Sequence, residues 1–266
     1  MDEACRRILE IYRKQEFCIV DYLYFANISA KKLFAVHHNA YPIENFREAL
    51  LQDYKKMNIQ KTFPVYQQAI FDADMVLMDW IALQIFYFLA TRKRLDNLNG
   101  TDFCPYLLSY IKQCHPGHMN VLLYGTYPHL LERTEKLLIS QGYNVVYAQD
   151  GYTNIYWDKV DLALKGKEKD INVLLIARST PDYPMQELWS LANKDRIRQC
   201  RFIVMNQAGT FDFWVGEQKR APKLIRLIRL ERLRRLVSDP KRNIKKVVAS
   251  FSLFSYIFSY LILKKR

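Results

Sequence analysis

Short apolar runs that alternate with helical periodicity limit the fold of this chain more than any other feature. The runs are LFAV at 33–36, MVLM at 75–78, NVLLY at 120–124, NVVYA at 144–148, INVLLIA at 171–177 and RFIVM at 201–205. Runs of this length, rich in Val, Ile and Leu, are typical of strands buried on both faces of a parallel sheet. The stretch Pro128 to Ser140 predicts a helix with Leu130, Leu131, Leu137 and Leu138 inward. We therefore predict an α/β fold with a Rossmann-like, largely parallel sheet and helices on both faces.

The C-terminal segment has a different character from the rest of the chain. From Ala221 onward the pattern is helical and strongly basic, so we expect an α/β catalytic domain at 1–218 and a helical appendage at 219–266. In LIRLIRLERLRRLV, leucine and arginine each recur every three residues, so one helix carries neighbouring apolar and cationic stripes. Such a helix suits an anionic membrane surface.

The segment Val247 to Leu263 contains no charge and is bracketed by basic residues. At about 1.5 Å per residue it spans about 25 Å, which is short of the roughly 30 Å core of a bilayer. We therefore favour a helix lying in the membrane interface, with a short transmembrane span as the alternative.

Charge and cysteine content narrow the class of protein. The 266 residues carry a formal charge of +13 and a pI near 9.4, so the expected partners are phosphorylated small molecules, an acidic membrane surface or nucleic acid. Five cysteines without a C-x-x-C pair argue against a disulfide framework and a zinc ribbon, and indicate a reducing cytoplasm. The charged N-terminus does not match a signal peptide, so we expect no export.

Polar or small residues follow every apolar run. Ligands of open α/β sheets bind beyond the carboxyl ends of the strands, so these residues are candidates for a binding site. They are His37, His38, Asn39, Asp79, Gly125, Thr126, Asp150, Gly151, Ser179, Thr180 and Asn206. Between a strand and a helix, Gly125 and Thr126 could present backbone N–H groups to a phosphate, with a plain tight turn as the alternative.

The segment Gly209 to Arg242 carries a long pattern of aromatic, acidic and basic residues. It resembles the pattern G-x-F-D-F-x-A-G, R-A-P, L-E-W-L-x-R-L and E-P-x-R of the WecG/TagA/CpsF glycosyltransferases of bacteria. Upstream, the chain is similar to the family at PMQE (184–187), at DGY (150–152), at Gly125 and at Asp79. The resemblance covers roughly residues 33 to 246. The chain departs from the family pattern at His37, Trp80, Asn97 and Arg232.

The resemblance implies an inverting glycosyltransferase at the cytoplasmic face of the bacterial inner membrane. It would move a hexose or N-acetylhexosamine from a UDP-sugar to a polyprenyl diphosphate-linked sugar, in the synthesis of O-antigen, capsule, exopolysaccharide or teichoic acid. Asp79 matches the position of the family's general base, and His37 is the next candidate. The alternative for Asp79 is a helix N-cap.

The resemblance also implies a set of binding residues. Donor or acceptor contacts are expected from Asn39, Gly125, Thr126, Asp150, Gly151, Tyr152, Gln186, Glu187, Asp212 and Arg220. The acceptor's diphosphate would be bound by Arg235, Arg242 and Lys245. We expect Asp212 to be a buried carboxylate paired with Arg220, in a structural rather than a catalytic pair.

The triplet Asp72-Ala73-Asp74 has the spacing of a metal-binding D-x-D motif. It precedes an apolar run, however, and so lies at the end of the strand opposite the expected ligand site. We interpret it as a solvated turn and expect neither an essential metal nor a cofactor. Cys114 to His118 has no second pair of ligands at the usual spacing, so we expect a surface turn there.

Two other functional classes remain as alternatives. The arginines between 220 and 242 could bind nucleic acid, but that reading does not explain the uncharged tail, so we expect no nucleic-acid partner. The departures at His37, Trp80 and Asn97 would also fit a membrane-bound, non-catalytic scaffold of the same fold. A homo-oligomer is compatible with either reading.

Overall fold

The computed structural model describes residues 1–23, 69–78, 98–178, 185–207 and 209–218, together with Phe88 and Arg92. Its strands are β1 (Cys18–Leu23), β2 (Met75–Met78), β3 (Met119–Gly125), β4 (Asn144–Gln149), β5 (Ile171–Ala177) and β6 (Phe202–Asn206). Its helices are α1 (Asp2–Gln15), α6 (Gly100–Cys114), α7 (Pro128–Ser140), α8 (Trp157–Leu164), α9 (Met185–Ala192), α10 (Lys194–Gln199) and α11 (Thr210–Trp214).

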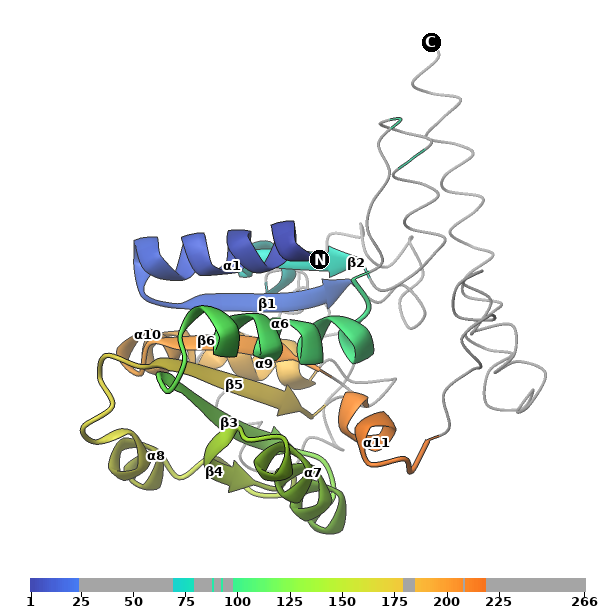
Figure 1. Ribbon diagram of the computed structural model, residues 1–266, viewed down its shortest axis with the longest axis vertical. Helices are drawn as coiled ribbons and strands as arrows, with labels where there is room; N and C mark the ends of the chain where they lie inside the picture. Colours follow the sequence, from blue (N-terminus) through green and yellow to red (C-terminus); the bar gives the residue numbers. More distant parts are fainter. Residues whose placement is uncertain are drawn as a thin grey trace, which may run out of the picture.

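The six strands form one sheet in the order β2-β1-β6-β5-β3-β4, and every described pairing is parallel. Figure 1 shows their arrowheads pointing the same way, toward the side where α11 lies. Residues 171–177 and 119–125 pair along their full length at the centre of the sheet. The predicted α/β fold with a parallel sheet is therefore confirmed.

The strand β1 was missing from the sequence-based expectation. Its sequence CIVDYL contains a charged residue, Asp21, which breaks the apolar run. In the structure β1 lies inside the sheet between β2 and β6, with Val20 opposite both Met75 and Met205. β1 is buried because other parts of the chain pack on both of its faces. A short apolar run that contains a carboxylate does not by itself predict such a strand. The run at 33–36 lies outside the described residues.

Alternate residues of each strand face two separate cores. Val121 and Leu123 of β3 pack on the side covered by α1, α6 and α7, whereas Leu122 and Tyr124 pack on the side covered by α8, α9 and α10. Both sides are apolar, which explains why the strands read as continuous hydrophobic runs. Helices on both faces are thus confirmed.

Helix α7 has the predicted bounds. Leu130, Leu131 and Leu138 are buried, whereas Leu137 is only half-buried. Thr134 takes the remaining inward position, and its hydroxyl donates a 2.8 Å hydrogen bond to the Leu130 carbonyl. The expected division at residue 218 stays a prediction, because residues 219–266 lie outside the described part of the chain.

Candidate active site

The carboxyl ends of β3 and β5 mark the place where the chain changes direction across the sheet. From β3 the chain passes through α7 to β4 on one face, and from β5 it passes through α9 and α10 to β6 on the other face. Connections that leave adjacent strands on opposite faces open a crevice between the strand ends, where α/β proteins bind ligands. This edge is therefore the candidate active site.

The turn after β3 brings the backbone of three loops together. Gly125 has φ +122° and Thr126 has φ +58°, both in the left-handed region. The Thr126 N–H donates to the Ala177 carbonyl at 2.8 Å, and the Gly151 N–H donates to the Thr126 carbonyl at 3.0 Å. A Cβ on Gly125 would lie 2.4 Å from the Ala177 oxygen, so only glycine fits. The predicted glycine turn thus joins the ends of β3, β4 and β5.

Helix α7 starts directly beyond this turn. Tyr127 is its N-cap, Pro128 occupies the first turn, and within the described chain no side chain caps the helix. The dipole of this 13-residue helix offers a positive pole to an anion, although Leu130 and Leu131 already donate to the Tyr127 carbonyl. The exposed rings of Tyr127 and Tyr152 lie beside it, with centroids 5.5 Å apart.

Asp150 shapes the loop after β4. Its carboxylate accepts hydrogen bonds from the Tyr152 N–H at 2.8 Å and from the Gln149 side-chain amide at 3.0 Å. These are local contacts, so the carboxylate holds the turn that presents Gly151 and Tyr152.

Arg178 is a site residue that the sequence reasoning missed. It follows β5 directly, donates a hydrogen bond to the Tyr124 hydroxyl and lies with its guanidinium carbon 5.0 Å from the centre of the Tyr124 ring. Burial raises the pKa of Tyr124 to about 12, so the phenol stays neutral beneath the cation. A guanidinium at this edge suits a phosphate group. The available signal was an arginine at the carboxyl end of a buried strand.

A second polar cluster lies at the carboxyl ends of β1 and β6, under α9. The Asn206 amide donates to the Asp21 carboxylate, and the Ser190 hydroxyl donates to the Asn206 oxygen at 3.2 Å. The Gln186 amide donates to the Glu187 carboxylate at 3.0 Å. Sequence reasoning identified Asn206, Gln186 and Glu187 but not Asp21, because it did not recognise β1.

The two carboxyl groups of this cluster are shifted by their surroundings. Burial raises the pKa of Glu187 to about 7. Burial, and secondarily the charge on Glu187, raises the pKa of Asp21 well above its usual range, while the hydrogen bond from Asn206 opposes the shift. The Glu187 carboxyl of α9 therefore acts on the ionisation of Asp21 in β1.

The site residue Asp212 is half-buried, not buried as expected. Its carboxylate accepts a 3.0 Å hydrogen bond from the Gln218 amide, and its carbonyl accepts one from the Gln218 N–H at 3.1 Å. Asp212 lies on the short helix α11, which leaves its side chain partly open to solvent. The neighbouring Phe211 and Phe213 had suggested that it would be buried. The proposed partner Arg220 lies outside the described residues.

Comparison with known proteins decides the family. The model of the glycosyl transferase WecG/TagA/CpsF family matches residues 49–266, which is most of the chain. The chain belongs to this family. The protein is therefore a glycosyltransferase by family, and its substrates are a sugar donor and an acceptor. The helix-start motif of the family, PMQE here, opens α9 at Met185 as expected.

Several residues expected from the family pattern lie outside the described residues. These are His37, Asn39, Asp79, Arg220, Arg235, Arg242 and Lys245. The last described residue before Asp79 is Met78, the partner of Leu23 in the pairing of β2 with β1. Among the helices that the structure describes, none is long and apolar enough to cross a membrane.

The D-x-D triplet lies at the amino end of β2, as expected, but Asp74 is not simply a solvated residue. Its carboxylate accepts hydrogen bonds from the Ile19 N–H at 2.7 Å and from the Gln15 amide at 2.5 Å. It therefore joins the start of β1 to the start of β2. Across the described segments, no three His, Cys, Asp or Glu side chains are grouped as metal ligands.

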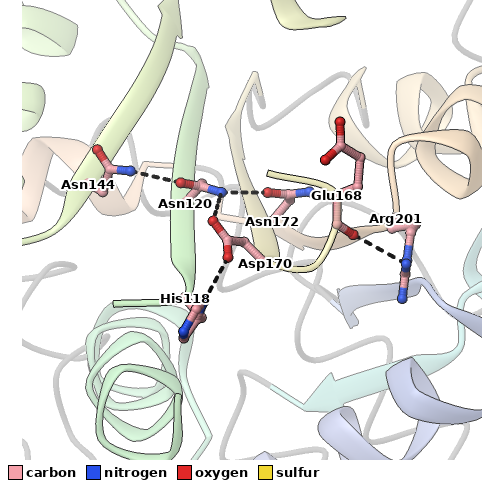
Figure 2. A network of polar contacts seen from close by, with 7 residues as sticks. All are labelled: His118, Asn120, Asn144, Glu168, Asp170, Asn172 and Arg201. Atoms are coloured by element: carbon pink, nitrogen blue, oxygen red, sulfur yellow. Dashed lines mark hydrogen bonds and ion pairs between the residues drawn. The ribbon is translucent and has the colours of Figure 1, made fainter. Parts of the chain in front are cut away.

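The opposite, amino edge of the sheet carries a polar ladder (Figure 2). Asn144 donates to Asn120 at 2.7 Å, and Asn120 donates to Asn172 at 3.0 Å and to Asp170 at 3.2 Å. His118, in the predicted turn before β3, contacts the other Asp170 oxygen at 3.0 Å. These side chains satisfy one another across three strands, so we assign them a structural role.

Proposed function

We propose that the protein is an inverting glycosyltransferase that moves a hexose or N-acetylhexosamine from a UDP-sugar to a polyprenyl diphosphate-linked sugar. The observation that carries the proposal is the edge between β3 and β5. The glycine turn and the N-terminus of α7 lie at this edge, and Arg178 follows β5 at the same edge with its guanidinium over Tyr124. A helix N-terminus and a guanidinium both suit the diphosphate of a sugar nucleotide.

The donor contacts follow from the same edge. The Thr126 and Gly151 N–H groups are already bonded to the Ala177 and Thr126 carbonyls, so the turn acts by setting the start of α7 and not by donating to the diphosphate. Asp150 holds the loop that carries Tyr152. The guanidinium of Arg178 stabilises the negative charge that develops on the leaving UDP. Donor or acceptor contacts from Asn39, Gln186, Glu187, Asp212 and Arg220 belong to this proposal.

The reaction needs a base on the acceptor side. Asp79 takes the proton from the acceptor hydroxyl while that oxygen bonds to the anomeric carbon. The bond from the anomeric carbon to the diphosphate breaks in the same displacement, and UDP leaves with the bonding electron pair. Attack from the face opposite UDP inverts the configuration at the anomeric carbon.

The acceptor side involves the membrane. Arg235, Arg242 and Lys245 bind the acceptor's diphosphate, and the basic appendage holds the protein on the anionic cytoplasmic face of the membrane. Neutralisation of both diphosphates by arginine and lysine makes a divalent metal unnecessary in this scheme.

The test is a transfer assay with radiolabelled UDP-sugars and a short-chain polyprenyl diphosphate-sugar. We expect product that depends on both donor and acceptor, with inverted anomeric configuration. Binding of UDP without product from any donor would favour the non-catalytic scaffold. Binding of nucleic acid but not of UDP would favour the nucleic-acid-binding alternative.

A further inference from the structure

Two buried carboxyl groups, those of Asp21 and Glu187, lie between the expected position of the donor diphosphate and the strand that precedes the proposed base. The proposed function puts the donor diphosphate at the ends of β3 and β5 and the base directly after β2. In the strand order, β6 and β1 lie between β5 and β2. With about 4.8 Å between neighbouring strands, β5 and β2 are roughly 14 Å apart. The sugar that leaves the diphosphate for the acceptor therefore lies over the ends of β6 and β1.

Asp21 and Glu187 are the acidic side chains at that position. They are 1% and 2% exposed, from β1 and α9 respectively. One oxygen of Asp21 is bonded to Asn206 and one oxygen of Glu187 to Gln186. The other oxygens, Oδ2 of Asp21 and Oε2 of Glu187, have no hydrogen-bond partner among the described residues. Among the buried atoms without a partner in the described residues, these two are the carboxylate oxygens. A buried carboxylate oxygen without a partner is costly, so we take these two as contacts for a ligand.

The charge of the pair indicates the chemistry of that ligand. Two adjacent buried carboxyl groups do not both ionise, because each disfavours the charge of the other. Near neutral pH the pair therefore holds a proton, as the raised pKa values of both groups indicate. It presents one O–H donor beside acceptor oxygens. A sugar hydroxyl both donates and accepts, so it matches this arrangement, whereas another carboxylate is repelled.

We propose that Asp21 and Glu187 form the subsite for the hydroxyl groups of the donor sugar and select a neutral sugar over a uronic acid. This inference rests on the proposed function and specifies the donor class within it. Among the described residues of the cluster, the remaining side chains are the neutral Gln186, Ser190 and Asn206, which do not offset a further negative charge.

The test compares two donors that differ only at C6 of the sugar. Dissociation constants of the full-length protein are measured by calorimetry for UDP, UDP-glucose and UDP-glucuronate. We expect wild type to bind UDP-glucose at least about tenfold more tightly than UDP-glucuronate, because the second ligand brings a like charge to a buried site. The double variant Asp21→Asn with Glu187→Gln removes both ionisable groups at nearly constant shape and should bring the ratio toward one.

Asp158→Asn is the matched control. This exposed residue of α8 undergoes the same loss of charge away from the carboxyl edge and should leave the ratio at its wild-type value. Equal affinity of wild type for the two UDP-sugars would overturn the inference, whatever the variants do. So would a wild-type ratio in the double variant, with UDP binding as the check that it is folded. Failure of wild type to bind UDP itself would instead contradict the proposed function.

Discussion

Gly125 at the end of β3 lies directly opposite Ala177 at the end of β5, so close that a Cβ on the glycine would sit 2.4 Å from the Ala177 carbonyl oxygen. The contact places two backbones side by side at the crevice where the donor diphosphate is expected. It also makes the glycine the most sensitive backbone position of the candidate site.

Gly125→Ala should destabilise the protein by about 2 kcal/mol or more and abolish UDP binding, because it adds a steric clash to a left-handed φ. Urea unfolding and calorimetry measure the two effects. Gly117→Ala is the control, since Gly117 has φ +78° but open space around its Cα. It should cost only about 1 kcal/mol and leave UDP binding intact. Equal losses in the two variants would contradict the importance of the close approach.

Glu187→Gln should change how stability depends on pH. The pKa of Glu187 is raised from 4.5 to about 7 by burial, so as pH rises between these values the unfolded chain loses its proton first and the folded state is progressively disfavoured. Above about pH 7 the effect is constant, at about 3 kcal/mol. The glutamine variant lacks the free-energy cost of ionising a buried carboxyl group. The pKa of Asp21 should also fall, because the charge on Glu187 is gone.

The measurement is the free energy of unfolding of both proteins at about pH 4 and about pH 8, which lie below and above the range in which Glu187 titrates. The glutamine variant should gain stability relative to wild type on going to the higher pH. Two parallel pH profiles would show that Glu187 ionises normally and is not buried beside Asp21.

Asp79→Asn should abolish transfer while leaving folding and UDP binding nearly unchanged, because it keeps the shape and removes the basicity. Loss of a general base costs about 10²–10⁴ in rate. Single-turnover kinetics with saturating donor measure the effect. A rate within a few fold of wild type would restore the helix-cap interpretation of Asp79, and His37→Gln would then be the variant to test.

Transfer should proceed without added divalent metal and remain undiminished by EDTA. Both Asp74 oxygens are already engaged, one by the Ile19 N–H of β1 and the other by the Gln15 amide at the end of α1, so Asp74 has a structural role. The cationic groups at the site neutralise the leaving diphosphate. A strict requirement for magnesium or manganese in dialysed enzyme would rule this out.

Removal of residues 247–266 should release the protein into the soluble fraction of lysed cells. Arg235→Ala combined with Arg242→Ala should weaken acceptor use more than UDP binding, because these residues are assigned to the acceptor's diphosphate. Fractionation and acceptor titrations measure the two effects. Complete sedimentation of the truncated protein with membranes, together with normal acceptor kinetics in the double variant, would make the appendage a structural element only.

The local sequence was sufficient for most of the sheet and for the family. The runs at 75–78, 120–124, 144–148, 171–177 and 201–205 each become a strand, because a strand buried on both faces needs an almost purely apolar sequence. The glycine turn at Gly125 and the helix start at Met185 were likewise recognisable, since backbone geometry limits which residues occupy such positions.

The strand β1 and the pairing of Asp21 with Glu187 follow from the tertiary structure and not from the local sequence pattern. β1 has a charged residue in its middle, and it is a strand because β2 and β6 pair with it on both sides. Asp21 and Glu187 are separated by more than half of the chain, so only the packing of α9 on the sheet brings their carboxyl groups together. The sequence by itself therefore determined the fold class, the family and the glycine turn, since these depend on local geometry and on a contiguous motif. The coupled carboxyl pair and the position of Arg178 over Tyr124 depend on long-range packing, and only the tertiary structure reveals them.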